Sequence, residues 1–374
     1  MKMRTVFNAI GIAAILVGAL LIAGVFFSIE FDFSKLNSET YKIGTFVHDA
    51  EDELNEIEIN TTFFDVKIFP MDDEEKATIY FPHSENIRHE ITWVDGKLSI
   101  KVVDGRKWYE KWSLAEVDTE NTTIEVRLPH KDYEKLSVLV GSGDVSVTSK
   151  QNNEDVLSFS NVSVETGSGD IDFRAKVVSG EIPSHAGLSS GSGDVYLSGI
   201  QSGVPVSVAT KSGVITLKDC VSTESFTLSS KSGHIKVVNV VSTYDKFIIA
   251  NNDSGDVDML HVMIGAMKVT VDTGDVELSD VVIQGAGLRP NSTLSGGELR
   301  IETDTGDVEL KRSDAQSLFV TTDTGDVEIE LLTGKYYSVK SDTGDVKHPE
   351  HDQHHGQCHV TTDTGDVEIT VISK

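Results

Sequence analysis

TTDTGDVEIE, from Thr321 to Glu330, is the stretch that decides the fold. Up to Thr322, the side chains of Leu318, Val320 and Thr322 alternate with those of residues 317, 319 and 321. After the glycine, Val327 and Ile329 alternate with glutamates. A two-residue period rich in β-branched residues indicates a strand on each side of Gly325. Glycine reaches positive φ without steric cost, and the aspartate after it can bond local amides. The stretch is therefore predicted to be two strands that meet at a corner.

The same motif recurs about every twenty residues through most of the chain. Its first residues are Gly141, Gly167, Gly191, Lys211, Lys231, Asp253, Asp272, Asp304, Asp323, Asp342 and Asp363. A period of this length that persists so far is typical of a solenoid, because one unit cannot bury its apolar face alone. We predict an all-β fold, a parallel β-solenoid (β-helix) of about eleven coils whose corners stack in one column.

The segment before the repeats divides into regions of different composition. Ala9–Phe27 contains no charged side chain and is long enough to cross a bilayer as a helix. Lys2 and Arg4 precede it, so the N-terminus is expected in the cytoplasm and the rest outside the plasma membrane. A cleaved signal peptide is the alternative. The predicted regions are a cytoplasmic tail (1–4), a transmembrane helix (5–29), an acidic stalk (30–55), a β-rich cap (56–134) and the solenoid (135–374).

Composition narrows the range of partners. The chain has 32 Lys and Arg against 60 Asp and Glu, a net charge of −28. Nucleic acid is excluded as the main partner, because phosphate binding needs a basic face. The expected partners are the bilayer, through the N-terminal helix, and a surface ligand that is a glycan or a protein. Cys220 and Cys358 fall about seven coils apart, too far for a disulfide, so two free thiols are predicted.

Stacked corners would bring two columns of aspartates together. Like charges about 5 Å apart repel, and calcium prefers carboxylate and carbonyl oxygens, so calcium is a candidate ligand although no cofactor is required. The alternative is that each aspartate caps its own turn. Glu277, Glu309, Glu328 and Glu368 would extend the acidic surface. The candidate calcium residues are Asp272, Asp275, Asp304, Asp307, Asp323, Asp326, Asp342, Asp345, Asp363 and Asp366.

A histidine-rich segment near the C-terminus is the second candidate site. Imidazole and thiolate are ligands that zinc and nickel prefer, and several spacings here suit chelation. Adventitious surface binding is the alternative. The candidate transition-metal residues are His348, His351, His354, His355, Cys358 and His359.

Two further features bear on function. Gly285–Thr293 lengthens one repeat and contains Arg289, and such insertions often form a binding surface. A carbohydrate-active β-helix enzyme would need basic groups beside the acidic corners, for which only Lys211 and Lys231 qualify. No nucleophile elbow, zinc-protease motif or phosphate-binding loop occurs, so no catalytic residues are predicted.

The hydrophobic N-terminus, the leading strands, the Leu128-Pro129 pair and the serial Ser/Thr-Gly-Asp-Val/Ile units resemble the bacterial putative-adhesin family of β-strand-repeat proteins. The resemblance runs from about Glu56 to the C-terminus. It implies a surface-exposed, non-catalytic β-solenoid, sometimes associated with cell-envelope stress. The corners at Val214 and His234 depart from the pattern. The expected function is adhesin-like binding at the cell surface; a sensing or regulatory ectodomain and, second, a carbohydrate-active enzyme are the alternatives.

Overall fold

The structure is a computed structural model that describes residues 41–47, 53–71, 76–106, 122–148, 156–180, 184–284, 297–352 and 356–372. The chain forms two compact units. The smaller unit includes described residues 41–44, 81–90, 102–106 and 122, and the larger one contains the rest. No helix in these ranges is long and apolar enough to cross a membrane. The predicted transmembrane segment, 5–29, lies outside the described residues.

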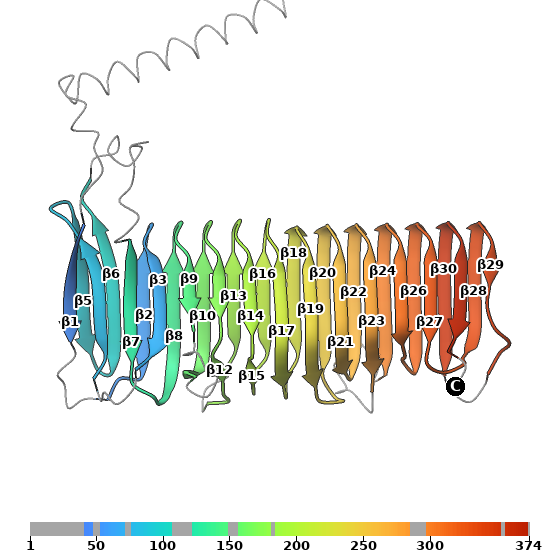
Figure 1. Cartoon of the computed structure of the whole chain (residues 1–374), viewed down its shortest axis with the longest axis horizontal. Helices are drawn as coiled ribbons and strands as arrows, with labels where there is room; N and C mark the ends of the chain where they lie inside the picture. Colours follow the sequence, from blue (N-terminus) through green and yellow to red (C-terminus); the bar gives the residue numbers. More distant parts are fainter. Residues whose placement is uncertain are drawn as a thin grey trace, which may run out of the picture. The chain divides into compact units, whose positions relative to one another are not determined.

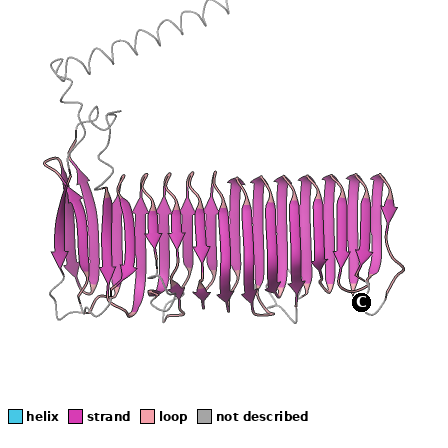
Figure 2. Cartoon of the chain, in the orientation of Figure 1, coloured by secondary structure: helices cyan, strands magenta, loops and turns pink. Residues whose placement is uncertain are grey.

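Strands account for the regular structure of the described ranges, as Figure 2 shows. In the larger unit the strands that precede the corners, together with residues 97–101 of β6, form one parallel sheet, which we call sheet A (Figure 1). Its members, in spatial order, are β6 (Lys97–Asp104), β2 (Glu56–Thr61), β8 (Asp132–Val140), β10 (Ser158–Thr166), β13 (Ala186–Ser190), β16 (Val206–Thr210), β18 (Phe226–Ser232), β20 (Phe247–Ser254), β22 (Ala266–Thr273), β24 (Glu298–Thr305), β26 (Ser317–Thr324), β30 (Gln357–Thr364) and β28 (Tyr336–Thr343).

The strands that follow the corners form a second parallel sheet, sheet B. Its members, in spatial order, are β7 (Thr123–Leu128), β3 (Asp65–Pro70), β9 (Val145–Val147), β11 (Ile171–Phe173), β14 (Val195–Ser198), β17 (Ile215–Ser222), β19 (Ile235–Ser242), β21 (Val257–Ile264), β23 (Val276–Ile283), β25 (Val308–Ser313), β27 (Val327–Leu331), β31 (Val367–Val371) and β29 (Val346–Lys347). The remaining strands are β1 (Lys42–Val47), β4 (Thr78–His83), β5 (Ile87–Val94), β12 (Lys176–Val177) and β15 (Gln201–Ser202).

The core lies between the two sheets and repeats in register from coil to coil. Val320 pairs with Val360 in sheet A, and Val327 pairs with Val367 in sheet B; each of these side chains is at most 1% exposed. Alternate residues point to opposite faces of a strand, so one face of each sheet buries its aliphatic side chains. Each fully buried Val, Leu or Ile contributes roughly 1.5–3 kcal/mol of transfer free energy. The prediction of an all-β fold with stacked parallel strands is confirmed.

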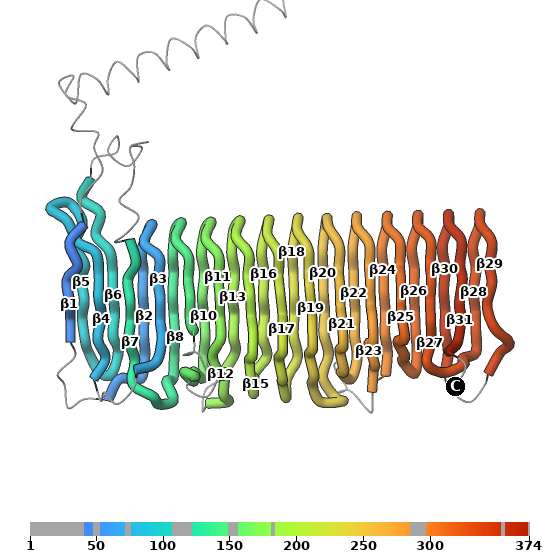
Figure 3. Tube along the Cα trace, viewed as in Figure 1, coloured from blue at the N-terminus to red at the C-terminus, as the bar shows by residue number. Residues whose placement is uncertain are grey.

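The coils do not follow one another strictly in sequence order. At the C-terminal end β30 lies between β26 and β28 (Figure 3). The coil at Asp363 therefore lies between the coils at Asp323 and Asp342 in the stack. At the other end β2 lies between β6 and β8. At both ends, therefore, the order of the coils in space differs from their order in the sequence. Each end of the stack is covered by a coil that is second from the end in sequence.

The predicted cap strands also differ from expectation. β2 and β3 form a coil of the stack, and Asp65 takes the corner position although no glycine precedes it. β4 runs antiparallel to β7 and so departs from the parallel pattern. In the smaller unit Phe81 and His89 pack with ring centroids 5.0 Å apart.

Candidate functional surfaces

At most corners, the aspartate that follows the glycine accepts a hydrogen bond from the neighbouring coil. Asp307 Oδ1 accepts a hydrogen bond from the backbone N–H of Asp326 at 2.8 Å, and Asp326 Oδ1 accepts one from the N–H of Asp366 at 2.8 Å. Asp366 in turn accepts from the N–H of Asp345 at 2.8 Å. A first run of such bonds begins at Asp65 and ends at the N–H of Val214, and a second run begins at Asp256, because Val214 and His234 offer no carboxylate. These carboxylates therefore link adjacent coils by hydrogen bonds, rather than only capping their own turns.

The corner glycines are required by the closeness of the coils. A Cβ on Gly325 would collide with the carbonyl oxygen of Gly306, and one on Gly365 would collide with that of Gly325. The later corners also have positive φ, 155° at Gly325 and 147° at Gly365. An inward hydroxyl completes several corners: Ser190 Oγ donates to Gly169 O at 2.9 Å and accepts from the N–H of Gly193 at 2.8 Å.

The structure stacks both predicted aspartate columns. The threonines that follow the first column are paired from coil to coil, which places Asp272, Asp304, Asp323, Asp363 and Asp342 on successive corners. The second column, Asp275, Asp307, Asp326, Asp366 and Asp345, forms the hydrogen-bonded ladder. Within the described ranges no three His, Cys, Asp or Glu side chains are grouped so that they could hold a metal ion. The calcium sites stay a prediction.

A third acidic column follows the outer face of sheet B. Asp258, Glu277, Glu309, Glu328 and Glu368 are paired in register on five adjacent strands. Partial burial, with the nearby carboxylates of Glu277 and Asp256, raises the pKa of Asp258. Lys311 reduces the repulsion between carboxylates in the middle of this column, because its Nζ lies 3.3 Å from Glu277 and 2.7 Å from Glu309.

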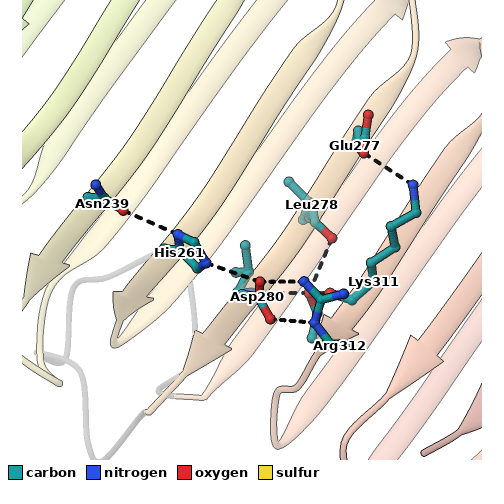
Figure 4. Close-up of polar contacts among 9 residues, drawn as sticks. Asn239, His261, Glu277, Leu278, Asp280, Lys311 and Arg312 are labelled. Atoms are coloured by element: carbon teal, nitrogen blue, oxygen red, sulfur yellow. Dashed lines mark hydrogen bonds and ion pairs between the residues drawn. The ribbon is translucent and has the colours of Figure 1, made fainter.

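Sequence reasoning missed a polar column on sheet B, of which Figure 4 labels Asn239, His261, Asp280 and Arg312. Its members all have left-handed backbone, with φ between 47° and 55°: Asp219, Asn239, His261, Asp280 and Arg312. Asn239 Nδ2 donates to Asp219 Oδ1 at 2.7 Å, and Asn239 Oδ1 lies 3.2 Å from His261 Nδ1. His261 Nε2 lies 3.2 Å from Asp280, which binds Arg312 through both carboxylate oxygens. The Arg312 guanidinium lowers the pKa of Asp280.

A break in the alternation marks this column in the sequence. Inward residues are normally two apart, but here they are three apart, as in Leu217 and Cys220 or Val237 and Val240. The extra residue takes the left-handed conformation, which Asn, Asp and His tolerate better than other side chains. The spacing was therefore a usable signal, although the hydrogen bonds between coils were not visible in it.

The histidine-rich segment is only partly assembled. His359 points outward and stacks on Phe319 with ring centroids 5.5 Å apart, whereas Cys358 is fully buried. Neighbours on a strand face opposite sides, so Cys358 and His359 do not converge. His348 and His351 have ring centroids 5.5 Å apart. His354 and His355 lie outside the described residues, and the transition-metal site stays a prediction.

Both cysteines are free and buried, in agreement with the sequence. Burial raises the pKa of the Cys220 thiol to about 11 and that of Cys358 to about 12. Because the thiolate is the reactive form, neither group is suited to nucleophilic chemistry at neutral pH.

The remaining sequence candidates are exposed or outside the described ranges. Lys211 and Lys231 occupy the corner position that Asp253 holds in the next coil, and all three are exposed. The insertion Gly285–Thr293 lies outside the described residues.

Together, these features define an all-β, repeat-built parallel solenoid whose exposed polar side chains form columns with one residue per coil. The chain belongs to the Toastrack DUF4097 family, whose model matches residues 54–246 and 237–374. The predicted resemblance is confirmed by this match.

Several solved structures are similar to the chain at low identity. They include a putative adhesin from Bacteroides fragilis (11% identity, 90% of this chain and 99% of that chain covered, TM-score 0.33). Others are a putative adhesin from Parabacteroides distasonis (10%, 89% and 99%, TM-score 0.34) and a putative cell adhesion protein from Clostridium sporogenes (10%, 89% and 100%, TM-score 0.20). No curated protein matches the chain.

Proposed function

We propose that the chain is a single-pass plasma-membrane protein whose solenoid faces the outside and binds a surface ligand without catalysis. The column arrangement carries this proposal. Acid–base or nucleophilic catalysis needs different groups that converge on one reacting atom. Here the described polar groups repeat once per coil and are tied to the neighbouring coil, as in the aspartate ladder. A repeated, rigid surface is suited to multivalent binding.

The anchored topology is supported by the sequence. The uncharged run Ala9–Phe27 follows Lys2 and Arg4 and precedes Glu30 and Asp32. Positive residues favour the cytoplasmic side. The large negative charge of the rest of the chain suits an exposed, soluble surface and opposes close contact with anionic lipid.

The topology is tested with tags at both ends of the full chain. In intact cells an external protease should remove a C-terminal tag and leave an N-terminal tag protected. Loss of the N-terminal tag during export would instead show a cleaved signal peptide. Replacing Lys2 and Arg4 by glutamate should randomise the orientation, whereas replacing them by each other should not.

Binding and catalysis are separated by a second experiment. The detergent-solubilised full chain is applied to a glycan array and to fixed cells, and is assayed for depolymerisation of acidic polysaccharides. Binding without turnover is expected. Turnover that is lost in Lys211→Ala or Lys231→Ala would refute the non-catalytic proposal, since these two lysines occupy positions in the corner column.

A further inference from the structure

The last coil of the stack is the one formed by β28 and β29. β28 pairs with β30 on one side, and β29 pairs with β31 on the same side. Among the described residues, no strand pairs with the other side of either. Unpaired strand edges are templates for another strand, and repeat proteins normally cover them.

The core is also open at this coil. Val346 is paired with Val367 and faces the interior, yet it is 39% exposed where Val367 is 1% exposed. Val339, paired with the fully buried Val360, is only half-buried. Apolar side chains that should be covered by a further coil therefore meet solvent here.

The backbone groups of β28 alternate between the two sides. The N–H of Tyr336 donates to Gly356 O at 2.9 Å, toward β30. The N–H of Tyr337 points the other way and donates to His351 Nδ1 at 3.2 Å. By the same alternation Val339 and Ser341 direct their N–H and C=O groups to the open side. The N–H of Asp352 donates to Lys335 O at 2.8 Å, so His351 and Asp352 together cover the start of this edge, where the His351 ring also stacks on Tyr336 at 4.9 Å.

We propose that this edge pairs antiparallel with β28 of a second copy of the chain, about a two-fold axis at Val339. With such an axis, Tyr337 of one copy lies opposite Ser341 of the other, and the two copies of Val339 lie opposite each other. The inward-facing side chains of both strands are then on the same side of the joined sheet. The axis also places Lys340 opposite Ser338, so no like charges face each other across the pair. His351 leaves Tyr337 when the outer hydrogen bonds form.

This proposal makes a second copy of the chain the partner of the binding module. It rests on the proposed function for the location of both copies at membranes. The stack runs from β6 to β28. Joining two copies at β28 puts their N-terminal strands at opposite ends of one continuous stack. With both copies anchored as proposed, this arrangement joins two facing membranes.

A cysteine pair tests the register directly. Val339→Cys in the detergent-solubilised full chain should form a disulfide-linked dimer under mild oxidation with copper–phenanthroline. Opposed residues of a hydrogen-bonded antiparallel pair have Cα atoms about 5.5 Å apart, within disulfide range. Thr343→Cys is the control, because its two copies would lie about 27 Å apart along the strands. The native thiols are buried. Equal cross-linking of the two variants, or none at Val339→Cys, would overturn the register.

Charge at Ser338 tests the same interface without altering the ladder to β30. Ser338→Glu would face Lys340 twice across the axis and should tighten the dimer roughly 2- to 30-fold; Ser338→Lys should weaken it similarly. His351→Ala should also tighten it, since Tyr337 N–H is released. Sedimentation velocity measures these changes. A monomer at all concentrations, or identical effects of the two Ser338 variants, would refute the pairing.

Vesicle clustering separates this inference from the proposed function. Vesicles that contain the full chain should cluster, and Ser338→Lys should reduce clustering. A dimer in detergent with no clustering of vesicles would contradict the joining of two facing membranes and leave the pairing of the two edges intact. An outward-facing chain that neither dimerises nor cross-links would refute the pairing and leave the proposed function intact.

Discussion

The two aspartates of one corner should behave differently when each is removed. Asp326 accepts the backbone N–H of Asp366 at 2.8 Å, whereas Asp323 lies in the neighbouring column, outside this ladder. Both side chains are exposed and carry the same charge. Asp326→Ala and Asp323→Ala are therefore a matched pair that differ in one hydrogen bond.

The size of the stability difference between the two variants depends on how far the corner is exposed to water. A hydrogen bond to a charged acceptor contributes about 1.5–3 kcal/mol, and exposure to water reduces this to about 1 kcal/mol. Removing either charge relieves repulsion between neighbouring coils by less than about 1 kcal/mol per pair at ~5 Å, and salt screens this further. That relief is common to both variants. Asp326→Ala should thus be less stable than Asp323→Ala by about 1 kcal/mol.

Amide hydrogen exchange of residues 357–372 measures the effect locally. A loss of about 1 kcal/mol speeds exchange of the Asp366 amide about fivefold in Asp326→Ala. Asp326→Asn keeps an acceptor oxygen and should lie between that variant and the wild type. Equal exchange in Asp326→Ala and Asp323→Ala would refute a ladder that holds the coils together.

Four other outcomes are expected. Gly325→Ala should destabilise the chain by several kcal/mol in urea titration because its Cβ meets the adjacent coil, whereas Gly199→Ala, which has open space and only a positive φ, should cost about 1–2 kcal/mol. Burial, with a nearby histidine, lowers the pKa of His89 to about 4. Its unfolded pKa is about 6.5, so the stability of the smaller unit is full above pH 6.5 and falls by about 3 kcal/mol toward pH 4; His89→Phe should remove this dependence. Cys220 and Cys358 should resist thiol reagents in the folded chain, and two thiols per chain should react after denaturation. If the aspartate columns bind calcium, millimolar calcium should raise the unfolding midpoint more than sodium chloride of equal ionic strength; equal shifts would contradict specific sites.

The local sequence pattern was sufficient to predict corners and strands, because the residues involved have a single structural role there. Gly325 predicted a corner, and the alternation of Val327 and Ile329 predicted a strand, because both follow from backbone sterics and from burial of one face. The polar column was harder to recognise. His261 is an ordinary polar residue in its own repeat, and its contacts are with Asn239 and Asp280, each about twenty residues away.

The sequence alone determined that the chain is an acidic, repeat-built parallel β-solenoid with an N-terminal hydrophobic segment, because these properties depend on period, composition and turn chemistry. Only the tertiary structure decided which coil lies beside which. The repeats are nearly alike, so the coils at Asp342 and Asp363 fit either order by pattern. Long-range pairing of β30 with β26 places one of them inside and leaves the edge of β28 open.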